Sequence, residues 1–201
     1  GHNAACERIA EAALEAGADY ICLCDTNGGM VPGNVIDIID RVNKEVKAVL
    51  GAHFHNDSGC ATANTLIAVE KGIKMVHGTV NGYGERCGNA DLCQIIPNLE
   101  IKLNKRCLKE GSLKHLTNLS RFVNETANQT ADASQPFVGR NAFTHKGGMH
   151  ASGVSKESKA FEHVDPETVG NTREILISEL SGKKSIIIRA KEFGINLEND
   201  L

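Results

Sequence analysis

The first hundred positions alternate between apolar stripes at helical spacing and short, unbroken apolar runs. The stripes predict helices over 3–16, from Pro32 to about 46, over 59–71 and over 89–97. The runs over 20–24, 49–54 and 75–80 predict buried strands. Strands that begin about 25–30 residues apart, each followed by a helix, are typical of βα units in a parallel sheet.

Each predicted strand ends in polar residues that are suited to chemistry. These groups are Asp25–Gly28, His53–Asp57 and Asn81–Arg86. A TIM barrel collects functional groups from all of its strand ends, whereas an open doubly wound sheet does so near its switch point. The pattern therefore favours an α/β chain that forms part of a TIM barrel over an open sheet.

The regular alternation of predicted strands and helices ends at about residue 104. Residues 112–128 have a helical pattern, 129–141 form a polar connector with Pro and Gly, and Asp165–Glu167 is a typical helix start. We therefore predict a partial barrel over 1–104 and an appended, mainly helical region over 105–201.

Composition narrows the classes of function. The 201 residues are 41% apolar and 23% charged with a net charge of −3, which argues against a nucleic-acid surface. Apolar runs fall short of the roughly 20 residues that a membrane span needs. Seven cysteines without a disulfide-like framework indicate a reducing cytoplasm. The chain does not open with Met and begins in a helical pattern, so we expect an internal segment of a longer protein.

His53 and His55 are the strongest candidates for a functional site. Residues two apart in a strand point to the same side, so both imidazoles would face one place. Such a pair suits a divalent cation, and Mg, Mn and Zn all fit. Asn56 and Asp57 would orient the imidazoles rather than bind the metal. The alternative is two histidines held by structural hydrogen bonds.

The stretch NGYGERCGN over 81–89 is the second candidate. Its glycines permit close backbone approach, so the loop can wrap a site, although its spacing is not the dinucleotide motif. Glu85 and Arg86 either serve the site or form an ion pair that pins the loop. Asp25 and Thr26 either close a turn or bind substrate.

Other residues carry weaker signals. Cys22, Cys24 and His77 are predicted as packed strand residues rather than metal ligands, and Cys87 as a weak candidate nucleophile. His145 and His150 flank Lys-Gly-Gly outside any apolar periodicity, which indicates a functional loop.

Three blocks together resemble one enzyme family. HFHNDSG over 53–59, NGYGERCGNADL over 81–92 and AFTHKGGMHASGV over 142–154 resemble the α-isopropylmalate, homocitrate and citramalate synthases, which are acetyl-CoA-dependent, metal-dependent TIM-barrel enzymes. Within this family, the sequence is most similar to the citramalate synthases. The resemblance covers nearly the whole chain and implies the last three βα units of a (β/α)8 barrel followed by a helical linker subdomain.

The resemblance also implies roles for individual residues. His53, His55 and Asn89 would be metal ligands, and Thr26 would bind the carboxylate of a 2-oxo acid. His150 would be a catalytic residue, contributed by the helical region of one subunit to the barrel of its neighbour in a homodimer. The family also places a tyrosine there, but this chain has only Tyr20 and Tyr83, so that role is vacant or filled differently.

The implied reaction is a Claisen-type condensation of acetyl-CoA with a 2-oxo acid in branched-chain amino-acid biosynthesis. Pyruvate would give citramalate, on the route to isoleucine, or 2-oxoisovalerate would give 2-isopropylmalate, on the route to leucine. A metal-binding aspartate and a catalytic glutamate of the family lie on earlier strands, so we expect the isolated chain to be inactive. The alternatives are a hydroxymethylglutaryl-CoA lyase-like enzyme and a non-catalytic fragment of the same fold.

Overall fold

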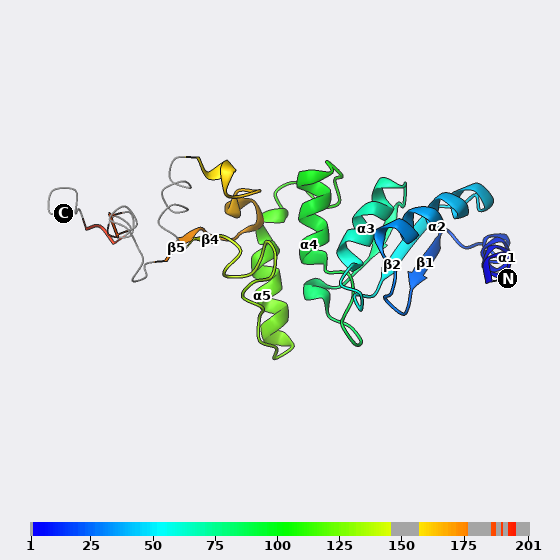
Figure 1. Ribbon diagram of the computed structural model, residues 1–201, viewed down its shortest axis with the longest axis horizontal. Helices are drawn as coiled ribbons and strands as arrows, with labels where there is room; N and C mark the ends of the chain where they lie inside the picture. The colour runs from blue at the N-terminus through cyan, green and yellow to red at the C-terminus, as the bar shows by residue number, and fades with distance from the viewer. Residues whose placement is uncertain (1, 146–156, 177–185, 188–189, 191–192, 196–201) are drawn as a thin grey trace. The chain divides into compact units, whose positions relative to one another are not determined.

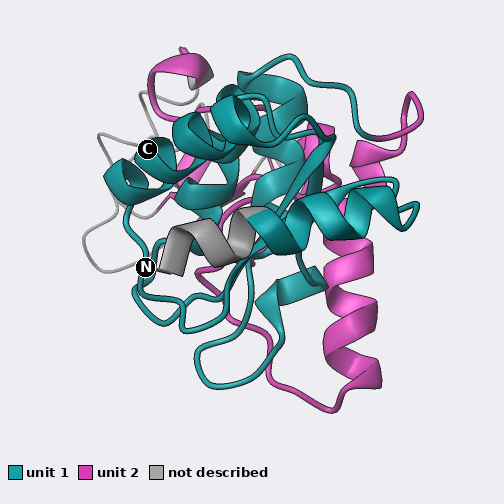
Figure 2. Cartoon of the chain, turned by 90° about the vertical axis from the view of Figure 1, so that its right-hand side faces the viewer, with its two compact units in different colours: residues 1–107 teal, residues 108–201 magenta. Residues whose placement is uncertain are grey.

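The computed structural model describes residues 2–145, 157–176, 186–187, 190 and 193–195, with backbone alone for residues 2–7 and 158. The chain divides into two compact units, Gly1–Cys107 and Leu108–Leu201, which are coloured separately in Figure 2. None of the helices in these described ranges has the length and apolar character that crossing a bilayer requires.

Unit 1 is built on three parallel strands in the order β1-β2-β3 (Figure 1). The strands are β1 (Ile21–Asp25), β2 (Leu50–Phe54) and β3 (Met75–His77). Helix α1 (His2–Glu15) precedes β1, α2 (Pro32–Glu45) and α3 (Ala61–Glu70) make the two crossovers, and α4 (Leu92–Pro97) follows β3. A π-helical turn over Asn98–Lys102 extends α4.

The two faces of this sheet differ in chemistry. Leu50, Ala52 and Phe54 are buried in one apolar cluster with residues of α2, α3 and α4. The alternate positions of β2 point the other way, and there Gly51 lies beside the Cys22 side chain at 3.6 Å from an ideal Cβ. The register aligns His53 with Cys24 and with His77 on the neighbouring strands. The helix-covered face holds unit 1 together and the opposite face carries the histidines.

Two boundaries differ from the sequence prediction. The strand predicted over 75–80 ends at His77, and the helix predicted over 89–97 begins at Leu92. The cause is long-range pairing: Thr79 and Asp91 form an isolated parallel bridge, and the Asp91 side chain accepts from the Cys93 amide at the start of α4. A local apolar pattern cannot show such pairing.

The longest helix among the described residues of unit 2 is α5 (Leu116–Thr126), which follows a 3-10 turn over Leu113–His115. Helix α5 is shorter than the predicted 112–128. Two strands that the sequence did not predict, β4 (Thr144–His145) and β5 (Glu174–Ile175), pair in parallel. Asp165 caps a 3-10 turn over Pro166–Val169, where the sequence predicted a helix start.

Candidate metal centre

The loops that follow β1, β2 and β3 meet at one edge of the sheet because the strands are parallel. There the His53 and His55 rings lie 5.0 Å apart between centroids and nearly perpendicular, as strand periodicity predicts. His77, which the sequence predicted as a packing residue, lies on the same side with its centroid 6.0 Å from that of His53. His77 borders the site because it is paired with His53 in the register of β2 and β3.

His55 and Asn89 form an isolated antiparallel bridge across this edge. The Asn89 side-chain amide donates to the Tyr83 carbonyl at 2.9 Å, which leaves its Oδ1 facing away from that contact. Asn89 Oδ1 and His55 Nδ1 are both buried without a hydrogen-bond partner; Asn64 Oδ1 is the third such atom among the described residues. Two unpaired polar atoms on bridged residues call for a partner outside the chain, since buried polar groups are normally bonded.

The loop over 81–89 is shaped by glycines at positions that accept no other residue without strain. Gly88 has φ +87°, and an ideal Cβ there would lie 2.1 Å from the Gly82 carbonyl oxygen. A Cβ on Gly84 would lie 2.1 Å from Asn89 Nδ2. The backbone is thus wrapped closely around the Asn89 side chain, whose position depends on these glycines.

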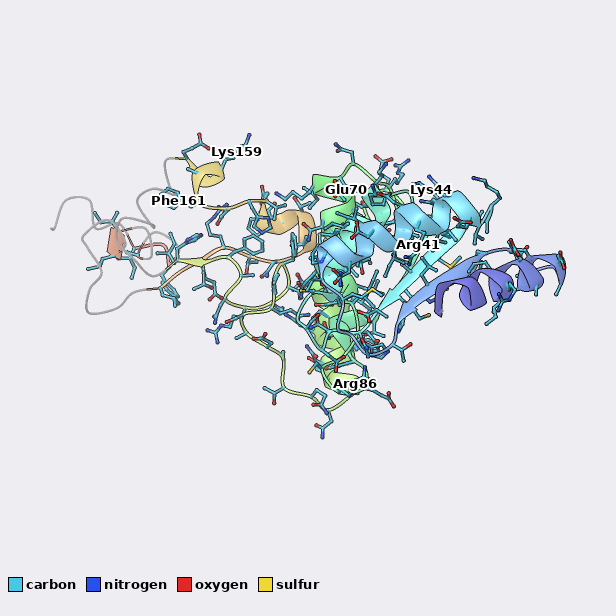
Figure 3. All side chains as sticks on the ribbon, turned by 45° about the vertical axis from the view of Figure 1, so that its right-hand side comes forward. Arg41, Lys44, Glu70, Arg86, Lys159 and Phe161 are labelled. Carbon is cyan, nitrogen blue, oxygen red and sulfur yellow. The ribbon has the colours of Figure 1, made fainter. Side chains whose placement is uncertain are left out.

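Arg86, which is labelled in Figure 3, lies in the loop after β3 and bonds to residues in the loops after β1 and β2. Its Nε donates to Asp57 Oδ1 at 2.8 Å, and its Nη2 donates to Asp57 Oδ2 at 3.1 Å and to the Thr26 carbonyl at 2.8 Å. The bonds from Arg86 lower the pKa of the Asp57 carboxyl. The backbone of Arg86 has φ +58°, a left-handed conformation that is uncommon for residues other than glycine.

The remaining predicted residues have mostly structural contacts. Asn56 Oδ1 accepts from the Ala61 amide at 3.2 Å at the start of α3, and Asp25 Oδ2 accepts from Met30 in the turn after β1. Glu85 lies 3.6 Å from Arg86 with a side chain 84% exposed, so Asp57 and not Glu85 is the close partner of Arg86. That Asn56 and Asp57 orient the imidazoles stays a prediction.

Electrostatics favour a neutral imidazole at His53. Burial, and then the neighbouring His55 and His77, lower the pKa of His53. The neutral ring is the form that binds metals. Burial raises the pKa of the Cys22 thiol to about 11, so it stays protonated and makes a 3.7 Å contact with His77 Nδ1. Cys22 is therefore poorly suited to be a thiolate ligand.

The donor set fits a divalent cation in part. His53, His55 and Asn89 could hold it through two imidazoles and one amide oxygen. Across the described ranges, His, Cys, Asp and Glu side chains do not gather in threes as a metal cage would require. His150, the predicted catalytic residue, lies outside the described residues.

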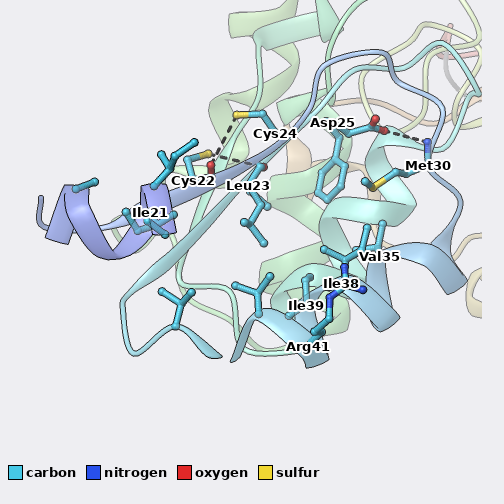
Figure 4. Close-up of a pocket in the computed structure, with 17 residues that line it drawn as sticks. Ile21, Cys22, Leu23, Cys24, Asp25, Met30, Val35, Ile38, Ile39 and Arg41 are labelled. Carbon is cyan, nitrogen blue, oxygen red and sulfur yellow. Dashed lines mark hydrogen bonds between the residues drawn. The ribbon is translucent and has the colours of Figure 1, made fainter. Parts of the chain in front are cut away.

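A cavity of about 400 Å³ is lined by residues of α1, β1, α2 and β2, and no histidine is among them (Figure 4). Its lining is mainly apolar and includes Ala13, Leu23, Ile39 and Phe54 from the helix-covered side of the sheet. Asp25 and Arg41 are the charged residues in its lining, and most of the other lining residues are apolar.

Comparison with known proteins identifies the family. The HMGL-like family model matches residues 2–123. The chain belongs to the HMGL-like family. A second model, the homocitrate synthase post-HMGL domain-like family, matches residues 137–201. Both halves of the chain therefore match, in the order that the three sequence blocks predicted.

Relatives of this HMGL-like chain include citramalate synthases. It is 49% identical to the (R)-citramalate synthase of Geobacter sulfurreducens over 94% of this chain and 36% of that protein. It is 37% identical to the 2-isopropylmalate synthase of Rhodopirellula baltica over 99% of this chain and 39% of that protein. The chain thus spans little more than a third of the length of the curated relatives that it matches.

Solved structures of the HMGL-like fold confirm the predicted architecture. The HMG-CoA lyase of Bacillus subtilis superposes with a TM-score of 0.54 at 26% identity, over 61% of this chain and 42% of that one. An HMG-CoA lyase of Acinetobacter baumannii in complex with coenzyme A and 3-methylmalate gives 0.51 at 25% identity, over 62% and 42%. The chain is part of a TIM barrel followed by a helical region.

Proposed function

We propose that this chain is the part of an acyltransferase that condenses acetyl-CoA with a 2-oxo acid, with pyruvate as the acceptor and citramalate as the product. The observation that carries the proposal is the bridged pair of His55 and Asn89, with one unpaired buried atom on each residue. The 49% identity to a citramalate synthase supports the choice of reaction and acceptor. The coenzyme A complex of a lyase with the same fold supports a thioester co-substrate.

In this proposal different residues of the chain bind the cation, bind the 2-oxo acid and transfer a proton. His53, His55 and Asn89 hold the divalent cation, which would act as a Lewis acid on the 2-oxo acid. Thr26 binds the acid's carboxylate, and Arg86 fixes the loop of Thr26 by its bond to the Thr26 carbonyl. His150 transfers a proton or polarises the thioester, as a histidine can near neutral pH. The metal-binding aspartate and the catalytic glutamate come from outside this chain.

The proposal extends to the setting of the enzyme. We infer a homodimer in which the helical region of one subunit reaches the barrel of the other, a cytoplasmic location, and a role in branched-chain amino-acid biosynthesis. The region to which this proposal gives that reach includes the post-HMGL domain-like match over 137–201.

The test is release of free CoA by the full-length protein with acetyl-CoA and, in turn, pyruvate, 2-oxoisovalerate and 2-oxoglutarate. We expect release with pyruvate, loss of release with a chelator, and recovery when Mg²⁺, Mn²⁺ or Zn²⁺ is added back. The isolated 201-residue chain should release none. Absence of release with every acid would refute the synthase, and cleavage of hydroxymethylglutaryl-CoA instead would favour the lyase that the solved neighbours exemplify.

Replacement of Arg86 by lysine is expected to lower kcat/KM by roughly 10- to 100-fold, the usual cost of losing a residue that orients a site. Lysine keeps the charge but cannot bond Asp57 through two nitrogens and the Thr26 carbonyl at the same time. Arg41→Lys on α2, where the arginine is exposed, is the matched control. Equal activity of the two variants in the CoA-release assay would show that the three-loop contact is dispensable.

A further inference from the structure

Thr79 lies two residues after the end of β3, and the proposed reaction gives it no role. Its hydroxyl donates to the Tyr83 carbonyl at 2.6 Å. The same carbonyl accepts from the Asn89 side-chain amide at 2.9 Å. A carbonyl oxygen has two lone pairs, so it can hold both side chains at once.

The Tyr83 carbonyl decides which end of the Asn89 amide is turned toward it. The two ends of an amide are similar in size, but the nitrogen only donates and the oxygen only accepts. Because a carbonyl can only accept, it bonds Nδ2 and turns Oδ1 away. Asn89 Oδ1 is buried without a hydrogen-bond partner, on the residue that is bridged to His55. The oxygen is thereby left for a cation.

The backbone of Thr79 is held on both sides. Its N–H donates to the Ala90 carbonyl at 3.0 Å, and its own carbonyl accepts from the amides of Gly82 at 3.1 Å and Leu92 at 2.9 Å. Thr79 also forms the isolated parallel bridge with Asp91. The β-branched side chain of threonine is stiff at χ1. A fixed backbone therefore gives the hydroxyl a fixed direction.

The backbone around the Tyr83 carbonyl has less restraint of its own. Tyr83 lies between Gly82, which has φ +68°, and Gly84. Glycine restricts its neighbouring peptide groups little, so the direction of this carbonyl depends on the bonds that it accepts. The Asn89 amide cannot supply the reference, because it is the group to be oriented. The Thr79 hydroxyl can.

We propose that Thr79 is a positioning residue, which acts through the Tyr83 carbonyl to hold the Asn89 amide with Oδ1 left for the divalent cation. The inference rests on the proposed function, in which Asn89 is a ligand of that cation. Thr79 binds no metal itself. Loss of a group that orients a metal ligand normally costs roughly 10- to 100-fold in affinity.

The experiment measures the affinity of the full-length protein for Mn²⁺ and for Zn²⁺ by calorimetric titration. Thr79→Val keeps the shape of the side chain and removes the hydroxyl. We expect affinity to fall roughly 10-fold, the lower end of that range, because Asn89 can still reach the Tyr83 carbonyl. Thr79→Ser restores the hydroxyl and should bind nearly as tightly as the wild type. Rescue by serine shows that the hydroxyl, and not the volume of the side chain, is responsible.

Thr65→Val is the matched control. Thr65 is fully buried in α3, and its hydroxyl donates to the Ala61 carbonyl at 2.8 Å. This variant loses a buried hydroxyl bond without any change at Asn89, so its metal affinity should equal that of the wild type. If Thr79→Val does not fold, Thr79→Ala takes its place, since it removes the hydroxyl without placing a methyl group against the carbonyl.

A double-mutant cycle with Asn89→Ala tests whether Thr79 acts through Asn89. Asn89→Ala should weaken metal binding more than Thr79→Val does, and Thr79→Val should cost nothing further when Asn89 is already alanine. Effects that multiply in the double variant would overturn the positioning role. Unchanged affinity in Thr79→Val, together with weak binding by Asn89→Ala, would overturn it as well.

Failure of the proposed metal centre gives a different result. If the wild type binds neither Mn²⁺ nor Zn²⁺, or if Asn89→Ala binds them as tightly as the wild type, then Asn89 is not a ligand. The ligand set and the role of Thr79 fall together in that case. Weak binding by Asn89→Ala keeps the ligand set, and the two Thr79 variants then decide the inference alone.

Discussion

Replacement of His55 by alanine is expected to weaken binding of the divalent cation by the full-length protein by more than about 100-fold, because loss of a ligand exceeds the 10- to 100-fold cost of losing a residue that only orients one. CoA release should fall below detection. The variant should nevertheless fold normally without metal. His55 Nδ1 is buried without a partner, so its removal leaves no bonded group behind and relieves a desolvation cost.

This combination separates a ligand from a structural histidine. Calorimetric titration with Mn²⁺ or Zn²⁺ gives the affinity, and thermal unfolding with and without metal gives the stability. The wild type should gain stability from the metal by mass action, whereas the variant should not. His115→Ala, at an exposed position in unit 2, is the control and should behave as the wild type. A variant that is unstable without metal yet binds it normally would contradict the metal centre.

Replacement of Gly88 by alanine is expected to lower the free energy of unfolding by about 2–5 kcal/mol, which combines the cost of a left-handed residue with that of overpacking. The position has φ +87° and the new Cβ would meet the Gly82 carbonyl oxygen at 2.1 Å. Since the Asn89 amide donates to the Gly82 carbonyl, any shift would displace Asn89 and weaken metal binding as well.

Gly59 provides the matched control for this prediction. It has φ +71°, but an ideal Cβ there has no neighbour within 4 Å. Gly59→Ala should therefore cost only the backbone term of about 1–2 kcal/mol and leave metal affinity unchanged. Chemical denaturation of both variants measures the difference. Equal losses would mean that the close contact at Gly88 is relieved at little cost.

The repeating βα pattern of unit 1 could be predicted because its apolar periodicity is local. The strands 20–24 and 49–54 and the helix from Pro32 correspond closely to β1, β2 and α2. In unit 2, β4 and β5 have two residues each, too few for an alternation to be visible. The two strands are nearly 30 residues apart in the sequence, so no local pattern indicates that they pair.

The part of the candidate site that could be predicted from the sequence is the pair of histidines at the end of β2. Strand periodicity placed His53 and His55 together, and their rings do meet. The bond between Arg86 and Asp57 joins residues 29 positions apart, so the sequence suggested the neighbouring Glu85 as the partner instead. The bridge between His55 and Asn89 is equally non-local. A single sequence contains no measure of these distances.

The alternation along β2 has a consequence for how this protein can evolve. Leu50, Ala52 and Phe54 support the fold, while Gly51 and His53 face the other way. Point substitutions at Gly51 and His53 alter the side that carries the candidate metal centre and leave the apolar contacts of Leu50, Ala52 and Phe54 in place. A one-residue insertion or deletion within 48–52 would exchange the two sets, directing an imidazole into the apolar cluster and Phe54 toward the candidate metal centre. This stretch should therefore accept drift in residue type and reject any change in length.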